Sequence, residues 1–467
     1  MNFSSVEFLF YFLPAFLVVY VATGRSNVVL LAGSAVFYAW GELRNAWVLL
    51  ASLLACHATG LALDRFPDRP VVRRRVMVLG VLFQLLLLAA FKYLGFLIHS
   101  LDALGLRIGL QIDDVPALPV GISFFTFHAI SYLVDCYRGN TRVERSLFRL
   151  ANYLLLFPHL LAGPIVRYAA IRRQLVRRHW TAARWRFGLE LLVIGLAQKL
   201  LLANNLAVTV DAIYALDRNA LSMGVAWLGA IGYAFQVYMD FSGYSHMALG
   251  LALLLGFSFP RNFNFPFRSL SVREFWRRWH ISLATWLRDY VYLPLGGSRR
   301  GAPRTMVNTV LVFTLCGLWH GAGWTFVLWG AYNGLFIVLE RLKLAEVTAR
   351  WPTVVQQGYA WLVFVVGVAM FRAQDLAQAV DFYAAMAGLA TTADHAPVLL
   401  RYLDGKALTV LLLAGCSMLP LREWIGGGHF VRPRFLVPRF AFLSLLLLLC
   451  AMTLAAGSHN PFLYFRF

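Results

Sequence analysis

The stretch "LCGLWHGAGWTFVLWGAYNG", Leu315 to Gly334, places one histidine, His320, in a run of apolar and small residues without Asp, Glu, Lys or Arg. Such a run is typical of a membrane core, where an ionisable side chain is costly and usually functional. Whether His320 lies in a membrane depends on the rest of the chain.

The composition of the whole chain is that of a membrane protein. Of 467 residues, 60% are hydrophobic and 14% charged, with a mean hydropathy of +0.66, whereas a soluble domain carries about 25% charged residues. The sequence predicts an all-α polytopic membrane protein with about 11–13 transmembrane helices plus re-entrant or interfacial helices, forming a single membrane-embedded domain over 1–467. The apolar blocks lie at 6–22, 27–43, 46–63, 76–98, 118–137, 187–206, 224–257, 305–321, 323–340, 357–373, 408–420 and 438–457.

Two apolar stretches predict departures from a simple span. Block 224–257 is long for one helix and holds Asp240 and "SGYS", so we expect it to be broken or tilted. Stretch 150–166, "LANYLLLFPHLLAGPIV", contains Pro158 and Pro164, which interrupt a helix. It is therefore predicted to be a broken or re-entrant segment whose backbone is satisfied by surrounding protein.

The distribution of cations predicts the orientation. Loops 64–75, 138–149, 167–186, 259–304, 341–356 and 422–437 hold 31 of the 42 Lys and Arg residues. Loops 99–117, 207–223 and 374–407 hold only 4. Because Lys and Arg mark the cytoplasmic side, both termini are predicted to lie outside the cytoplasm.

The net charge of +20 suits an anionic lipid surface or a phosphorylated cytosolic donor. Nucleic acid is excluded as a partner because the cations lie between spans and no nucleic-acid module is present. The five cysteines lie in or beside apolar spans without C-x-x-C spacing, which predicts small core residues instead of disulfides or metal ligands.

Three stretches concentrate polar groups where they are costly. They are "VYMDFSGYSHMALG" with Asp240 and His246, the segment Asn262 to Gly297, and the stretch around His320. The middle segment interleaves arginines with aromatic residues, which predicts an amphipathic helix at the cytoplasmic interface. A surface anchor does not explain His280, which follows Trp279 in its least polar part.

These residues resemble the membrane-bound O-acyltransferases, and within them the alginate O-acetylase branch. The motifs are "DFSGYS", "GFSFPRNFNFPF", "REFWRRWHISLATWLRDYVYLPLGG" and "GLWHGAGWTFVLWGAYNG", with "PVGISFFTFHAISYLVDCYRG", "FPHLLAGPIVR", "FRAQDLAQAVDFY" and the terminal "NPFLYFRF". They are collinear along nearly the full chain, with a motif-bearing core at about 118–340. One position departs from the family pattern: relatives read "SGYSDMA" where this chain has His246.

The resemblance implies a ring of membrane helices around a central funnel. It also implies that His320 is the family's invariant histidine and His280 its supporting histidine. Acetyl-CoA is the implied acyl donor, with no bound cofactor, and a periplasmic SGNH-type acetyltransferase is the implied partner. The function predicted is transfer of acetyl groups from a cytosolic donor for O-acetylation of an extracytoplasmic polysaccharide, to the polymer directly or through the partner.

The chemistry of the residues agrees with this prediction. Acyl transfer from a thioester to a hydroxyl needs a base, and histidine has a suitable unperturbed pKa. Gly317, Gly321 and Gly323 remove bulk beside His320, so that an acyl tunnel or another backbone can approach it. From the residues alone, a structural hydrogen-bonding role for His320 remains open.

Other roles also remain open. His280 could orient His320, bind the acyl carbonyl, seat the donor or pack, and Asp240 could orient a histidine or hold its span. His128, His159 and His246 lack ligand spacing, so no metal site is expected. Two other functions remain: transfer of D-alanyl or long-chain acyl groups, and a transporter or flippase. A transporter predicts an internal repeat, which is not found.

Overall fold

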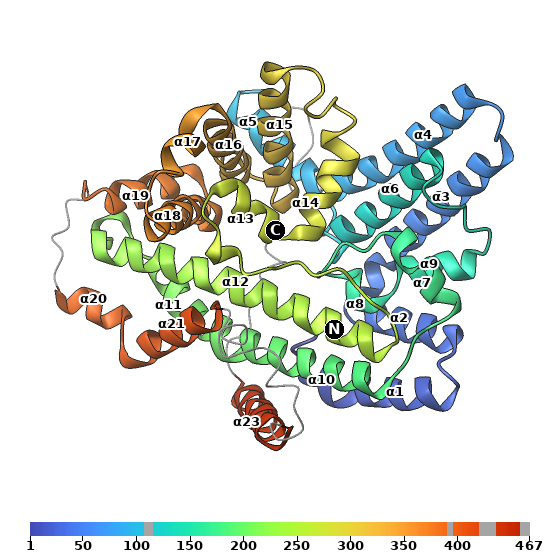
Figure 1. Ribbon diagram of the computed structural model, residues 1–467, viewed down its shortest axis with the longest axis horizontal. Helices are drawn as coiled ribbons and strands as arrows, with labels where there is room; N and C mark the ends of the chain where they lie inside the picture. Colours follow the sequence, from blue (N-terminus) through green and yellow to red (C-terminus); the bar gives the residue numbers. More distant parts are fainter. Residues whose placement is uncertain (107–114, 390–395, 420–435, 458–467) are drawn as a thin grey trace. The chain divides into compact units, whose positions relative to one another are not determined.

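The protein is described by a computed structural model that places residues 1–106, 115–389, 396–419 and 436–457. All regular elements in these ranges are helices (Figure 1). The prediction of an all-α chain is confirmed. The terminal motif "NPFLYFRF" and nearly all of the basic loop 422–437 lie outside the described residues.

One compact unit consists of Met1–Leu189 and Ala248–Pro260. Within it α3, α4 and α6 pack against one another, and a buried polar pair joins the first two: the Ser52 hydroxyl donates to Gln84 Oε1 at 2.7 Å. Its helices are η1 (Glu7–Phe12), α1 (Leu13–Ala22), α2 (Asn27–Glu42), η2 (Leu43–Asn45), α3 (Ala46–Arg65), α4 (Pro70–Leu88), η3 (Ala89–Tyr93), α5 (Leu94–Ala103), α6 (Ile122–Arg138), α7 (Leu147–Leu154), α8 (Phe157–Leu160) and α9 (Tyr168–Val176).

The stretch 150–166 in this unit is broken, as its prolines predict. Helix α7 ends at Leu154, the four-residue α8 follows, and buried irregular chain leads to α9. Side chains satisfy this backbone. The Tyr153 hydroxyl donates to the Val166 carbonyl at 2.9 Å, His128 Nε2 accepts from Val166 N at 3.2 Å, and His159 Nε2 donates to the Tyr153 carbonyl at 2.8 Å. Two histidines thus serve the backbone of a buried loop.

The other unit consists of Glu190–Met247 and Arg261–Phe467. Helices α10 (Ala182–Ala197) and α12 (Met223–Leu254) contribute to both units. The remaining helices are η5 (Gln198–Ala203), α11 (Asn204–Tyr214), η6 (Arg218–Ala220), η7 (Pro266–Arg268), α13 (Val272–Arg278), α14 (Ile281–Leu287), η8 (Arg288–Tyr292), α15 (Ala302–His320), α16 (Trp324–Leu339), η9 (Glu340–Leu344), α17 (Ala345–Thr348), α18 (Thr353–Arg372), α19 (Leu376–Met386), α20 (Ala396–Tyr402), α21 (Gly405–Ser417) and α23 (Leu436–Ala455).

Helix α12 runs without interruption through "DFSGYS", so of the two alternatives for this block the break is wrong, and the tilted helix stays a prediction. The reason is that its carboxylate is paired: Asp240 forms a buried ion pair with Lys199 of η5. Beside this pair Gly195 and Gly243 let the two helices touch, because a Cβ at either would overlap the other's carbonyl oxygen. With 32 residues and a rise of about 1.5 Å per residue, the length of α12 exceeds the thickness of a bilayer core, which is about 30 Å.

Five helical segments in the described residues are long and apolar enough to cross a membrane: Asn27–Arg65, Pro70–Ala103, Ala182–Tyr214, Thr353–Arg372 and Val437–Ala455. Shorter apolar helices, Glu7–Ala22 and Gly405–Ser417, accompany them. The chain is an all-α polytopic membrane protein, while the count of about 11–13 crossings and the single-domain boundary remain predictions.

Candidate active site

The stretch around His320 folds into a tight helical hairpin. Helices α15 and α16 lie side by side (Figure 1), joined by the three residues 321–323, of which Gly321 and Gly323 have an extended backbone. A Cβ on Gly317 would overlap the carbonyl oxygen of Phe326, whereas Gly321 makes room for the Phe326 ring. Gly317 therefore admits a neighbouring backbone, the second of the two alternatives that the sequence left open.

His320 is the last residue of α15 and stands in an aromatic cage. Its ring centroid lies 5.5 Å from that of Trp329 and 5.4 Å from that of Phe371, both edge-on. The neighbouring Trp319 packs against it at 4.9 Å. The ring is half-buried, so the cage fixes its plane without closing it off completely.

His280 lies at a break between α13 and α14, and not within one interfacial helix as predicted. Its backbone is left-handed, with φ 43° and ψ 53°, a region that non-glycine residues adopt only when surrounding contacts hold them. Phe275, Trp279 and Trp286 of this segment are buried in protein. These three aromatic residues therefore belong to the protein core, and the alternative of a mere surface anchor does not describe them.

The two histidines face each other. Their ring centroids are 6.2 Å apart, and the Phe241 ring contacts His280 edge-on at 4.5 Å. His280 is 3% exposed, and neither ring nitrogen has a hydrogen-bond partner among the described residues. A buried imidazole in this state is costly unless a ligand or water engages it, so His280 is available to bind an oxygen of a substrate.

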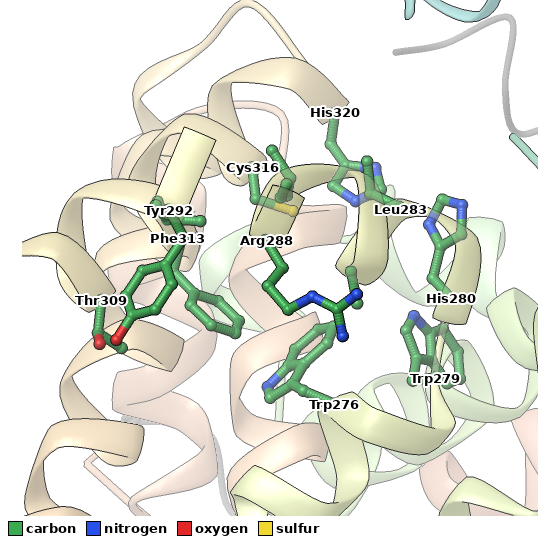
Figure 2. Close-up of a pocket in the computed structure, with 13 residues that line it drawn as sticks. Trp276, Trp279, His280, Leu283, Arg288, Tyr292, Thr309, Phe313, Cys316 and His320 are labelled. Carbon is green, nitrogen blue, oxygen red and sulfur yellow. The ribbon is translucent and has the colours of Figure 1, made fainter. Parts of the chain in front are cut away.

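Both histidines open into one cavity of about 220 Å³. Figure 2 shows their imidazoles and the Arg288 guanidinium directed toward the same space. The cavity is lined by Trp276, Trp279, His280, Leu283, Ala284, Leu287, Arg288, Tyr292, Thr309, Val312, Phe313, Cys316 and His320. Its walls are mostly apolar, as in most small-molecule sites.

Most of these lining residues were not predicted from the sequence, although the spacing of the residues in one wall indicates that they share a helix face. Thr309, Val312, Phe313, Cys316 and His320 all lie on α15 at helical spacing. Residues three, four, seven and eleven apart share one face of a helix. The wall could have been found by stepping back from His320. The opposite wall could not, because it depends on how α13 and α14 fold onto α15.

Arg288 supplies the cavity's permanent charge. It begins the π-helical turn η8, and its Nε donates to Asp289 Oδ1 at 2.7 Å. This hydrogen bond raises the pKa of Arg288 above its usual value, so the guanidinium stays cationic. The Arg288 side chain is largely exposed, whereas that of Asp289 is not. An anionic group could therefore compete with Asp289 for the guanidinium.

The remaining candidates do not line this cavity. Asp240 is paired with Lys199. His246, which departs from the family pattern, has a hydrogen-bond partner: its Nδ1 is 2.7 Å from Gln198 Oε1. His128 and His159 serve backbone groups, as described above. Across the described ranges no group of three or more His, Cys, Asp and Glu side chains is arranged to hold a metal ion, and the five thiols are free.

The chain is similar to known proteins along its whole length. Residues 120–376 match the profile of MBOAT, the membrane-bound O-acyltransferase family. The chain is 37% identical to the "Probable alginate O-acetylase AlgI" of Pseudomonas putida over the full length of both chains, and 40% identical to that of Pseudomonas aeruginosa over 84% of this chain and 76% of the relative. It is 31% identical to the peptidoglycan O-acetyltransferase of Helicobacter pylori over 83% and 80% of the two chains. The chain belongs to the membrane-bound O-acyltransferase family.

Proposed function

We propose that this protein transfers an acetyl group from acetyl-CoA to a hydroxyl for O-acetylation of an extracytoplasmic polysaccharide, with His320 as the general base. The observation that carries the proposal is the apolar cavity into which His320, His280 and Arg288 all project. It combines a half-buried base, a buried hydrogen-bond donor and a cation at the exposed end of the same cavity.

The cavity residues assign the steps. His320 takes the proton of the acceptor hydroxyl as its oxygen attacks the thioester carbonyl carbon. The neutral His280 donates its N–H to the carbonyl oxygen, on which negative charge develops. The carbon–sulfur bond then breaks, and the protonated His320 returns the proton to the leaving thiolate. The products are the acetyl ester and free coenzyme A thiol.

Arg288 supports acetyl-CoA as the donor. A phosphate is a strong partner for a guanidinium because it can accept two parallel hydrogen bonds. Arg288 belongs to the cation-rich segment 259–304, which is predicted to face the cytoplasm, where coenzyme A is made. The walls beyond it are apolar and suit the thin pantetheine arm and a small acyl group.

The acceptor is proposed from the similarity to a probable alginate O-acetylase and a peptidoglycan O-acetyltransferase. We favour transfer through a periplasmic SGNH-type partner, because the described part of this chain consists of helices without a separate domain to hold a polymer. The protein would then lie in the inner membrane with both termini in the periplasm. Transfer of D-alanine from a carrier protein is the second candidate, since it needs the same two histidines.

The decisive experiment is His320→Ala in a strain whose own copy of the gene is deleted, with His99→Ala, an exposed histidine of α5, as the matched control. We expect the exopolysaccharide to lose its O-acetyl groups in the first strain and keep them in the second, at equal amounts of membrane protein. Retained acetylation with His320→Ala would refute the assignment. Incorporation of D-alanine instead of acetate would select the second candidate.

The donor is tested with purified protein by measuring thiol release from acetyl-CoA and from acetyl-pantetheine, which lacks the nucleotide phosphates. Arg288→Ala should raise KM for acetyl-CoA at least about tenfold, the loss of one charged hydrogen bond of about 1.4 kcal/mol or more, and leave KM for acetyl-pantetheine unchanged. The control is Arg299→Ala, an exposed arginine outside the cavity lining. Equal effects on both donors would remove the phosphate from the proposal.

A further inference from the structure

The backbone at His280 is held by a segment that lies before it in the chain. Asn264 N donates to the Arg278 carbonyl at 3.0 Å, and Ile281 N donates to the Asn262 carbonyl at 2.9 Å. These two bonds bracket Trp279 and His280 from both sides. The Arg278 guanidinium adds a bond to the Asn264 carbonyl at 3.1 Å. The left-handed turn is thus clamped by backbone pairing.

The side chain of Asn262 caps the helix that follows His280. Its Oδ1 accepts from the Ser282 hydroxyl at 2.6 Å and from Ser282 N at 3.3 Å. The residue at the N-cap position of α14 is His280 itself, and its side chain makes no capping bond. Serine, threonine, aspartate or asparagine normally occupies that position and caps with its own oxygen. Here the oxygen comes from a residue 18 positions earlier in the sequence.

Asn262 is in turn anchored to α12. Its Nδ2 donates to Ser245 Oγ at 3.1 Å, and the side chain is 1% exposed. The same helix carries Phe241, whose ring contacts the His280 imidazole. One helix therefore supports both the imidazole and the residue that holds its backbone.

We propose that Asn262 is the positioning residue for His280. Because the Asn262 side chain caps the N-terminus of α14, the His280 imidazole does not have to cap it and is held opposite His320. The inference rests on the proposed function, because it gives Asn262 a role only if His280 binds the acyl oxygen. A misplacement of about 1 Å in such a group can lower the rate about 100-fold. Asn262 is not among the residues that line the cavity, so any effect it has on the reaction passes through the residues that it holds, with His280 first among them.

The test is a double-mutant cycle on thiol release from acetyl-CoA by membranes of the producing strain, which hold the acceptor whether it is the polymer or a partner, with the His320→Ala membranes as the blank. Asn262→Ala should lower kcat about 10- to 100-fold and change KM for acetyl-CoA less than about threefold. In a His280→Leu background the same substitution should lower kcat less than about threefold, because the group that it positions is already absent. A residue that only stabilises the fold would lower kcat by the same factor in both backgrounds, and that result would overturn the inference.

Two further variants keep the test decisive if Asn262→Ala folds poorly. Asn262→Asp keeps the oxygen that accepts from Ser282, and the Ser245 hydroxyl can turn to donate to it, so kcat should stay within about fivefold of the wild type. Failure of this variant to rescue kcat, when its melting temperature is normal, contradicts the capping role. Asn205→Ala, in the half-buried part of α11, is the control for loss of an asparagine. The inference is refuted if Asn262→Ala lowers kcat by the same factor with and without His280→Leu. The proposed function still stands in that case if His320→Ala abolishes activity.

Discussion

At the scale of single residues, His280 combines two properties that a structural histidine rarely has. It is 3% exposed in the protein, and its ring nitrogens have no hydrogen-bond partner within the described residues. Burying an imidazole in this way costs stability. Under the proposed function, this state is explained by an acyl oxygen that binds to His280 during turnover.

This explanation makes a prediction with opposite signs for stability and activity. His280→Leu replaces an unsatisfied polar ring with an apolar side chain of similar size, so the melting temperature should stay the same or rise. The same change should lower kcat about 10²–10³-fold, the usual cost of removing one donor to a developing oxyanion. His280→Asn keeps an N–H donor and should lose less. A melting temperature that falls in parallel with kcat would return His280 to a packing role.

Sequence reasoning found both histidines but not what surrounds them. His320 could be picked out because it is the single imidazole in an apolar run, and the spacing of α15 identifies its own wall of the cavity. The break at His280 could not be predicted, because no proline or glycine marks it. It is imposed by Asn262 and Asn264, whose partners become visible only when the chain has folded.

At the scale of elements, the α15–α16 hairpin depends on glycines at its contact face. A Cβ on Gly330 would overlap the carbonyl oxygen of Phe313 and lie 2.9 Å from the Thr314 Cα, both of them backbone atoms that cannot step aside. A Cβ on Gly323 would lie 3.5 Å from the nearest atom, an ordinary contact. The two positions therefore differ sharply in their tolerance of alanine.

We expect Gly330→Ala to separate the helices, with a loss of about 1–3 kcal/mol of stability and a large fall in kcat as His320 moves with α15. Gly323→Ala should keep both within error, because its extended backbone, with φ −168°, is open to any residue. Thermal melting in detergent and thiol release from acetyl-CoA measure the two effects. Equal behaviour of the two variants would show that the hairpin contact is not tight.

A second element-scale prediction concerns Glu144, which ties the loop after α6 to α9. Burial alone would raise the pKa of this carboxyl, but hydrogen bonds from the Tyr168 hydroxyl at 2.7 Å, from Ser146 N at 2.9 Å and from Arg149 Nε at 3.0 Å lower the pKa below its usual value. A lowered carboxyl pKa contributes stability above the unfolded value of about 4.3, and this contribution is lost as the pH falls through the folded value.

Glu144→Gln should therefore lower the melting temperature at pH 7 by about 2–4 °C, and the difference from the wild type should shrink as the pH falls below about 4.3. Melting curves of the purified variant and wild type between pH 7 and about pH 3 give the comparison. A difference that is independent of pH would mean that the carboxylate charge contributes nothing.

At the scale of the whole molecule, composition and helical period were enough to predict an all-α membrane protein, because they reflect the bilayer and not any single contact. The unbroken course of α12 has the opposite origin. Asp240 and the length of the block indicate a broken or tilted span, but the buried Lys199 of a neighbouring helix forms an ion pair with Asp240. Such pairing depends on which helices pack together in the folded protein, and a hydropathy profile of the sequence cannot predict it.

The orientation of the chain is the last prediction, and the proposed direction of transfer depends on it. The segment 293–301 between η8 and α15 carries Arg299 and Arg300 and adjoins the cavity residue Tyr292. The positive-inside rule places this segment in the cytoplasm and the segment around Asp217, after α11, outside. Green fluorescent protein fused after Arg299 should fluoresce and alkaline phosphatase fused there should be inactive, with the reverse at Asp217 and after Phe467. If the signals at Arg299 and Asp217 are exchanged, Arg288 would face the periplasm, where a coenzyme A donor is absent, and the donor would have to come from that side.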